Sequence, residues 1–234
     1  MIEVRDVVVT YDGARALDGV SLTIADGEFV LLVGPNGSGK TTLVRTFNAL
    51  REPDEGTVLV DGTDASESPV AARTKVGMVF QHPRDQFVAA TVGADVAFGP
   101  ENLGLDRSEI DHRVDESLDA VGLDGYRDER IAALSGGEQA RVAIAGALAM
   151  GADHLVLDEP LTGLDFPARR SVLDHLERLR EAGTSVVVVT HDLRDLVESA
   201  DRVVALSDGR VAFDSQPETA LERLETVDVR DPRC

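Results

Sequence analysis

Short apolar runs alternate with longer amphipathic stretches along this chain. Residues 4–11 are rich in β-branched side chains, and the turn pair Asp12-Gly13 connects them to residues 15–24, so we predict a β-hairpin. A second Asp-Gly turn precedes residues 29–33, a wholly apolar run that predicts a strand. The beginning of the chain is therefore expected to be a hairpin followed by a core strand.

One helix and a further strand come next. Leu43, Phe47 and Leu50 lie at helical spacing and predict a helix, which the following Pro53 ends. Residues 57–60 lead into another Asp-Gly turn and predict a second hairpin strand.

The pattern changes after a short apolar run at residues 76–80, which predicts a strand. From residue 85 to residue 150 the pattern becomes helical. The apolar side chains on one predicted helix face are Ile110, Val114, Leu118 and Val121. Asp106, and Ser135 with Glu138, have the positions of helix N-terminal caps. We therefore expect a mostly helical lobe inserted into a sheet domain.

Strands return in the last third of the chain. The predicted strands are residues 155–157, 186–189, 203–206 and 211–213. A helix from Pro167 to Gly183 separates the first two, and residues 218–234 predict a short helix with a charged tail.

Strands that alternate with helices indicate a largely parallel sheet and an α/β fold. We expect a mixed central sheet with flanking helices, an antiparallel β-subdomain and the inserted helical lobe. The chain would form one domain over residues 1–234, divided into a sheet core (1–84 and 151–216), a helical lobe (85–150) and a C-terminal helix with its tail (217–234).

The charge balance argues against one class of partner. The 234 residues include 43 acidic and 23 basic ones, which gives a formal net charge of −20, and only two of the basic residues are lysine, Lys40 and Lys75. Nucleic-acid binding depends on a basic stripe, which this sequence does not show, so a general DNA or RNA binder is disfavoured. The excess of carboxylates resembles the composition of proteins from salt-loving cells.

Membrane and secretion signals are not recognisable in the sequence. The longest apolar run, residues 142–152, is rich in Ala and Gly and is shorter than the roughly 20 residues of a membrane span. The first residues lack the basic, apolar and small segments of a secretion signal, so we expect a cytoplasmic protein. A single cysteine, Cys234, can form neither an internal disulfide nor a cysteine metal site.

Residues 34–42, GPNGSGKTT, fit the pattern Gly-x-x-x-x-Gly-Lys-[Ser/Thr] directly after a predicted strand. The loop consists of Gly34, Pro35, Asn36, Gly37, Ser38, Gly39, Lys40, Thr41 and Thr42. The glycines allow successive backbone N–H groups to face one anion, Lys40 adds a mobile positive charge, and the Thr41 hydroxyl can bind Mg²⁺. A helix that begins at about Thr41 directs its positive end to the same place. This motif predicts a polyphosphate site rather than a simple glycine turn.

Three further polar groups follow short apolar strands: Gln81, the pair Asp158-Glu159, and His191. Ligands of parallel sheets bind outside the carboxyl ends of the strands, so we expect these groups to meet the glycine loop. Asp158 can hold Mg²⁺ while Glu159 orients or deprotonates an attacking water. Gln81 could contact metal and water, and His191 the γ-phosphate, although each alone is equally typical of an exposed turn.

The stretch LSGGEQ at residues 134–139 decides the family. Together with the groups above, in this order, it makes the chain resemble the nucleotide-binding subunit of ATP-binding-cassette (ABC) transporters over residues 2–224. The resemblance implies ATP and Mg²⁺ as cofactors and stacking of Tyr11 on adenine. It also assigns the glycine loop as the Walker A motif, Gln81 as the lid glutamine, Asp158-Glu159 as the Walker B pair and His191 as the switch histidine.

The same resemblance implies a head-to-tail dimer. Its signature, which comprises Ser135, Gly136, Gly137 and Glu138, reaches the γ-phosphate of ATP bound by the opposite subunit, whether that subunit is identical or paralogous. Leu161-Thr162 and Ala140 stand where the family more often has other residues. These departures concern coupling in the dimer and not nucleotide binding.

Residues 79–105 are similar to the energy-coupling-factor group of importers. The resemblance implies transport of a vitamin or a transition-metal ion, such as biotin, cobalt or nickel, with a transmembrane coupling subunit and a membrane substrate-binding subunit as partners. The cassette would then lie on the cytoplasmic face of the cell membrane. The chain ends near the end of the cassette, which favours compact members such as the biotin type.

Three alternatives remain open on the residues. A soluble ABC protein of DNA repair or translation would carry a long coiled-coil insertion or a second cassette, and neither is visible here. A P-loop kinase or GTPase leaves residues 134–139 unexplained. A pure binding module would leave Glu159 without a role.

Overall fold

The computed structural model describes residues 1–233, so Cys234 lies outside the described residues. A four-stranded antiparallel sheet has the order β2-β1-β4-β5. Its strands are β1 (Ile2–Tyr11), β2 (Ala14–Ile24), β4 (Glu55–Val60) and β5 (Thr63–Asp64). Both predicted hairpins are therefore present, because β1 pairs with β2 and β4 pairs with β5 across their Asp-Gly turns.

The second sheet has six strands in the order β10-β9-β3-β8-β7-β6. They are β3 (Phe29–Val33), β6 (Val76–Val79), β7 (His154–Asp158), β8 (Ser185–Val189), β9 (Arg202–Ser207) and β10 (Arg210–Ser215). All neighbours pair in parallel except β10, which is antiparallel to β9. The predicted mixed sheet is thus confirmed, and its parallel strands place their carboxyl ends along one edge.

Alternate residues of the central strands enter two different cores. Leu31 and Val188 pack with the long helices, whereas their neighbours Leu32 and Val187 pack against the antiparallel sheet. This alternation follows from the two-residue period of a strand. Because both faces are covered, β3, β7 and β8 are buried at every position, which explains their wholly or largely apolar sequences.

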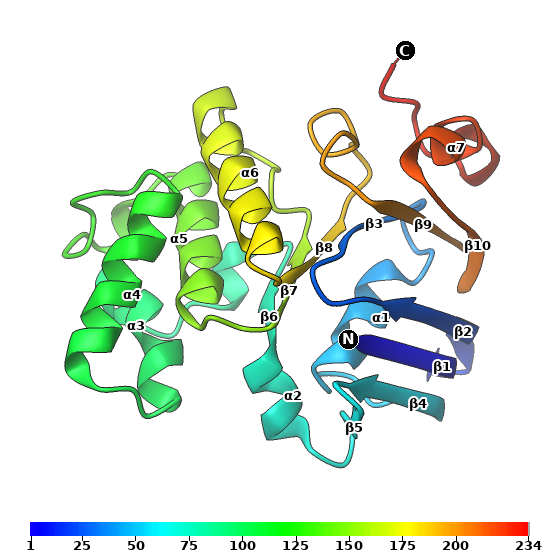
Figure 1. The fold of residues 1–234 in the computed structure, drawn as a ribbon, viewed down its shortest axis with the longest axis horizontal. Coiled ribbons are helices and arrows are strands. Elements are labelled where there is room, and N and C mark those ends of the chain that lie inside the picture. Colours follow the sequence, from blue (N-terminus) through cyan, green and yellow to red (C-terminus); the bar gives the residue numbers. More distant parts are fainter. Residues whose placement is uncertain (234) are drawn as a thin grey trace.

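The helices surround this sheet (Figure 1). They are α1 (Lys40–Phe47), α2 (Pro69–Lys75), α3 (Val92–Asn102), α4 (Arg107–Ala120), α5 (Gly136–Ala149), α6 (Phe166–Glu181) and α7 (Pro217–Leu221). Single 3-10 turns occupy Pro83–Asp85, Ile131–Ala133 and Leu224–Val227. Figure 1 shows α3, α4 and α5 grouped on the side of the central sheet opposite the antiparallel sheet. Among residues 1–233, none of the helices is both long and apolar enough to cross a membrane.

The structure differs from the sequence prediction at two helices. The first helix ends at Phe47 and does not include Leu50, because Ala49 adopts φ +53° and turns the chain away. Helix α2 was not predicted, and its only buried residue is Ala72, so it carries no apolar stripe that a sequence pattern could reveal. The caps at Asp106 and Ser135 are confirmed, since each side chain accepts a backbone N–H three residues later.

Candidate functional site

The loop between β3 and α1 requires glycine at two positions. Gly34 has φ +144°, and a Cβ there would lie 2.1 Å from the Leu206 carbonyl oxygen. Gly39 has φ +102°, and its Cβ would lie 2.5 Å from the Ala16 carbonyl oxygen. Any side chain at either position would therefore collide with the backbone of β9 or β2. The loop is therefore held closely between these two strands, directly before α1.

Lys40 lies at the first position of α1 and is only 8% exposed. Its Nζ donates hydrogen bonds to the carbonyl oxygens of Gly34 (2.8 Å) and Pro35 (2.9 Å). Burial lowers the pKa of the Lys40 amine, while the nearby carboxylates of Glu159 and Asp158 act in the opposite direction. The side chain is thus a cation held between the glycine loop and two acids.

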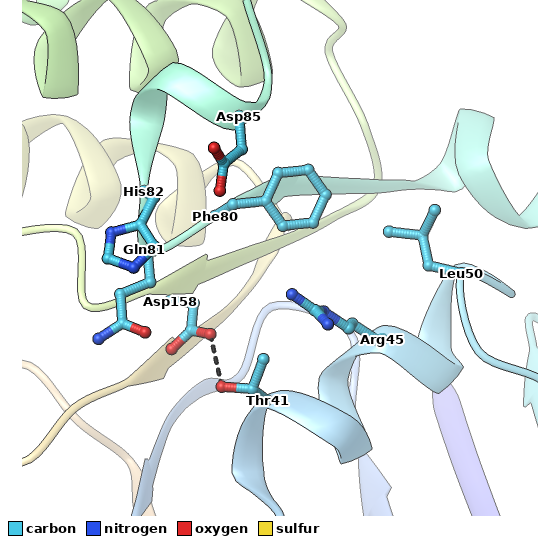
Figure 2. A pocket seen from close by; sticks show the side chains of 8 residues that line it. All are labelled: Thr41, Arg45, Leu50, Phe80, Gln81, His82, Asp85 and Asp158. Carbon is cyan, nitrogen blue, oxygen red and sulfur yellow. Dashed lines mark hydrogen bonds between the residues drawn. The ribbon is translucent and has the colours of Figure 1, made fainter. Parts of the chain in front are cut away.

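Asp158 ends β7 and faces the beginning of α1 (Figure 2). The Thr41 hydroxyl donates a hydrogen bond of 2.7 Å to its Oδ2 atom. Burial raises the pKa of the Asp158 carboxyl, which is 3% exposed, and the bond from Thr41 partly offsets this. A hydroxyl and a carboxylate are hard oxygen ligands that suit Mg²⁺. Figure 2 shows Gln81 beside Asp158, at the end of the segment that leaves β6.

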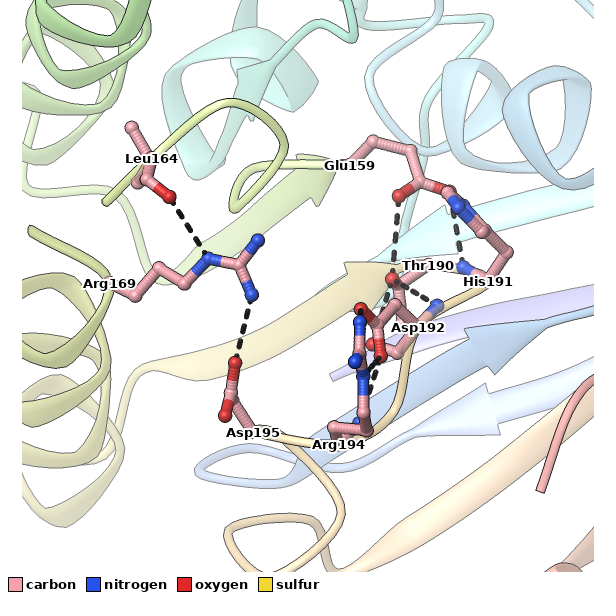
Figure 3. A network of polar contacts seen from close by, with 8 residues as sticks. All are labelled: Glu159, Leu164, Arg169, Thr190, His191, Asp192, Arg194 and Asp195. Carbon is pink, nitrogen blue, oxygen red and sulfur yellow. Dashed lines mark hydrogen bonds and ion pairs between the residues drawn. The ribbon is translucent and has the colours of Figure 1, made fainter. Parts of the chain in front are cut away.

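Glu159 is held by the segment that follows β8 (Figure 3). Its Oε1 atom accepts the backbone N–H of His191 at 3.1 Å and lies 2.6 Å from Nδ1 of the same residue. Its Oε2 atom accepts the Thr190 hydroxyl at 3.4 Å. The Glu159 side chain is 12% exposed and the His191 side chain 68% exposed. The Glu159 carboxylate is therefore oriented by its bonds to Thr190 and His191, and the His191 imidazole is open to solvent.

Three of the four polar groups that were expected to meet line one cleft of about 370 Å³, namely the glycine loop, Gln81 and Asp158-Glu159. Its lining residues are Ala16, Asn36, Gly37, Gly39, Lys40, Thr41, Thr42, Gln81, Asp158 and Glu159. His191 lines the neighbouring pocket and reaches this cleft through Glu159. Two residues of the site were not predicted from the sequence. Ala16 lines the cleft only because β2 passes beside the glycine loop, and nothing in the sequence marks Thr190 except that it directly precedes His191.

Two predicted elements lie away from this cleft. Tyr11 is not among its lining residues, and the Arg51 guanidinium lies 5.1 Å from the centre of the Tyr11 ring. None of the signature residues 135–138 lines the cleft either. Ser135 and Glu138 instead form a capping box at the beginning of α5, and this hydrogen bonding lowers the pKa of the Glu138 carboxyl. Within one cassette, the signature and the glycine loop therefore belong to separate surfaces.

A second cluster of potential ligands is already balanced in charge. Asp26, Asp61 and His154 form the one group of three possible metal ligands found among residues 1–233. The Met1 ammonium donates to both carboxylates, and Lys75 pairs with Asp61. Two positive groups thus meet two negative ones, and His154, whose Nε2 lies 3.2 Å from Asp61 Oδ1, joins this network to β7.

Comparison with known proteins identifies the family. The model of the ABC transporter family matches residues 17–162, which include the glycine loop, Gln81, the signature and Asp158-Glu159. The chain belongs to the ABC transporter family. It is an ATPase subunit of that family, and the fold and the family expected from the sequence are both confirmed.

Several relatives of this cassette carry transport names. An ABC transporter ATP-binding protein of Halobacterium salinarum is 64% identical over 99% of this chain and 100% of the relative. The cobalt import ATP-binding protein CbiO of Syntrophus aciditrophicus is 46% identical over 95% and 81%, respectively. The energy-coupling factor transporter ATP-binding protein EcfA1 of Symbiobacterium thermophilum is 50% identical over 92% and 77%. These relatives favour transport over a soluble cassette of DNA repair or translation.

Two solved structures share the whole architecture. The structure of cbiO1 from Clostridium perfringens, described as part of the ABC transporter complex cbiONQ, has a TM-score of 0.83 and 34% identity over 99% of this chain and 96% of that chain. The ATP-binding cassette MJ0796, described as a dimer in a post-hydrolysis state bound to ADP and Pi, has a TM-score of 0.85 and 32% identity over 93% and 99%.

Proposed function

We propose that this cassette hydrolyses MgATP to drive an importer of the energy-coupling-factor type, on the cytoplasmic face of the membrane. One observation carries the proposal: Lys40, Thr41, Asp158 and Glu159 line a single cleft, and Glu159 is bonded to His191. Phosphate groups, a divalent cation and an attacking water would each find a partner of suitable chemistry there. The cargo would be a transition-metal ion such as cobalt or nickel, or a vitamin such as biotin.

The phosphates would bind the N–H groups of the glycine loop and the beginning of α1. Lys40 lies at this end of α1, so its ammonium can exchange carbonyl partners for phosphate oxygens. Thr41 and Asp158 would hold Mg²⁺ with Gln81 beside them, and bound Mg²⁺ would neutralise charge on the phosphates. The pairing of a hydroxyl with a buried carboxylate fits such an ion.

Glu159 would act as the general base. Its carboxylate borders the cleft and is fixed by Thr190 and by the backbone N–H of His191, so one oxygen can face a water next to the terminal phosphate. His191 would hold Glu159 from its ring nitrogen and offer its exposed edge to the γ-phosphate. Positioning and charge stabilisation would carry this reaction, as in other phosphoryl transfers.

A second cassette would complete the site. The signature residues 135–138 lie off their own cleft, so they can serve ATP only in a partner subunit that is turned head to tail. Tyr11 is 43% exposed, and its ring would stack on adenine in the same dimer. Dimer formation by the related cassette MJ0796 supports this arrangement.

The membrane coupling subunit would dock on an apolar groove of about 740 Å³. Phe87, Ala133 and their neighbours line this groove, which begins three residues after Gln81 at Arg84. Movement of a docked segment could thus be transmitted to Gln81 in the cleft. The relatives CbiO and cbiO1, named for cobalt import and for the complex cbiONQ, support a membrane assembly with a separate substrate-binding subunit. Purification of that assembly from native membranes, with its bound ligand identified, tests the cargo.

Replacing the general base tests the proposed reaction. We expect Glu159→Gln to bind MgATP with unchanged affinity and to hydrolyse it at least about 100-fold more slowly, because an amide cannot accept the proton. The matched control is Glu181→Gln, the same change at an exposed position at the end of α6. Nucleotide titration and phosphate release measure the two quantities. Turnover by Glu159→Gln within a few-fold of the control would refute the assignment.

A further inference from the structure

The loop between Glu159 and α6 lies between two other functional segments. Residue 137 of the signature helix touches it, because a Cβ on Gly137 would be only 3.0 Å from the Gly163 carbonyl oxygen. At its beginning, the Thr162 N–H donates to the Glu159 carbonyl oxygen at 3.2 Å. Residues 160–165 are therefore in contact with two segments. One is the signature, which would serve the ATP of the partner subunit, and the other is Glu159, the proposed base for the cassette's own ATP.

One side chain ties this loop to the segment that carries His191. Arg169, one turn into α6, donates from Nε to the Leu164 carbonyl oxygen at 3.2 Å and from Nη1 to Asp195 Oδ2 at 3.0 Å. Figure 3 shows Arg169 extended between these two partners. Asp195 lies four residues after His191 and lines the same pocket as Glu159. The two ends of the guanidinium thus hold the two loops that flank the catalytic pair.

No other cation shares this role in the neighbourhood that the structure describes. Arg194 is engaged with Asp192 through bonds of 2.9 and 2.6 Å, and these bonds lower the pKa of the Asp192 carboxyl to about 2. Arg170, the neighbour of Arg169, is exposed and forms no hydrogen bond or ion pair with either loop among residues 1–233. The planar fork of arginine suits this role, because Nε and Nη1 are separate donors that reach acceptors on two different loops, whereas the donors of an ammonium all lie on one atom.

We infer that Arg169 is a positioning residue that links the signature-facing loop at residues 160–165 to the His191 segment, so that Glu159 is correctly placed only when this loop is in place. The inference rests on the proposed function. A shift of the loop, caused by engagement of Gly137 and its neighbours with a partner, would move Leu164, and Arg169 would pass the displacement to Asp195 and its segment. Hydrolysis in one site would thereby depend on the signature of the same cassette.

Four variants and one control test this link. The variants are Arg169→Ala, Asp195→Ala, the double variant and Arg169→Lys, and the matched control is Arg170→Ala, which removes the same charge at the adjacent position. For each protein, kcat, MgATP affinity and melting temperature are measured. ATP-dependent dimer formation is measured by light scattering in the Glu159→Gln background.

We expect Arg169→Ala and Asp195→Ala each to lower kcat about 10-fold or more, since small misplacements of catalytic groups have effects of this size. MgATP affinity and dimer formation should stay within about two-fold of wild type, because Arg169 does not line the cleft of the glycine loop and its bonds go to Leu164 and Asp195. The double variant should be no slower than the slower single variant, as expected for partners in one interaction. Arg169→Lys, which can keep only one of the two contacts, should fall between wild type and Arg169→Ala.

Three results would overturn the inference: wild-type kcat in Arg169→Ala, multiplicative losses in the double variant, or an equal loss in Arg170→Ala. A merely structural role would instead lower melting temperature, dimer formation and kcat together, and that outcome also refutes the link. Should Arg169→Ala fail to fold, Asp195→Ala and Arg169→Lys decide the question. Failure of the proposed function can be distinguished from failure of this inference. In the first case, Glu159→Gln would still hydrolyse ATP although Arg169 is unchanged.

Discussion

Asp158 illustrates how one residue can serve a site at the expense of the fold. Its carboxyl is almost fully buried, and burial raises its pKa, with the neighbouring charge of Glu159 acting in the same direction. A carboxyl whose pKa is higher in the folded than in the unfolded state stabilises the fold only at low pH, and this contribution is lost as the pH rises through the folded pKa. At neutral pH the charged form therefore opposes folding until a cation binds.

We predict that Asp158→Asn raises the melting temperature of the protein at neutral pH in the absence of nucleotide and Mg²⁺. The amide keeps an oxygen that can accept the Thr41 hydroxyl bond, and each 1 kcal/mol gained corresponds to about 2–4 °C. The gain should shrink as the pH falls through the raised folded pKa and should be gone below the value of an ordinary aspartate, about 3.9. Asp174→Asn, at an exposed position of α6, is the matched control. An unchanged or lower melting temperature in Asp158→Asn would contradict the prediction.

Site residues that are marked by their chemical type and by their spacing from apolar strands could be predicted from the sequence. Residues whose role depends only on where the fold places them could not. Lys40, Asp158 and Glu159 were predicted together, because each ends or follows an apolar strand and the carboxyl ends of parallel strands meet at one edge. Thr190 was missed, since a threonine at a strand end has many uses. The two contacts of Arg169 also depend on loop geometry that no periodicity reveals.

At the scale of elements, wholly buried strands and capped helices are the predictable parts. The strands β3, β7 and β8 were found because every position is apolar or borders an apolar run, and α4 and α5 because Asp106 and Ser135 cap them. The predicted end of α1 was wrong, because the left-handed conformation of Ala49 leaves no signal in the sequence. The exact division of the chain at residues 84, 150 and 216 stays a prediction.

The capping box of α5 begins the helix, and the proposed function gives Ser135 a second role at the ATP of the partner subunit; the two roles can be tested separately. Ser135→Ala removes the bond from the Glu138 N–H and should cost about 1 kcal/mol. Asp106→Ala removes the equivalent bond from the Glu109 N–H at the beginning of α4 and should cost a similar amount. In the Glu159→Gln background, we expect only Ser135→Ala to weaken ATP-dependent dimer formation, measured by light scattering. Equal effects of both variants on the dimer would mean that Ser135 acts only as a cap.

At the scale of the whole molecule, the net charge of −20 leads us to expect that charge repulsion outweighs ion pairing. Even if every one of the 23 basic residues neutralised an acidic residue, 20 of the 43 acidic residues would remain in excess. Exposed pairs such as Arg107 with Asp111 contribute only about 0–1 kcal/mol each. Salt weakens attraction and repulsion alike, but the repulsion among the excess carboxylates is the larger sum. Added salt should therefore stabilise the folded chain, because the unfolded chain can spread the same charges apart.

We predict that the melting temperature at neutral pH, followed by circular dichroism, rises steeply between about 0.1 M and about 2 M KCl, and that ATPase activity rises over a similar range. The screening length falls from about 10 Å to below about 3 Å across this series, which is less than the usual spacing of surface charges. The control is the same series near pH 4.5, the isoelectric point given by the sequence, where little net charge remains to be screened. If KCl acts through charge, the dependence should be much shallower there. A flat series at neutral pH would refute charge repulsion as a major term, and equal slopes at both pH values would assign the effect of salt to stronger burial of apolar surface instead.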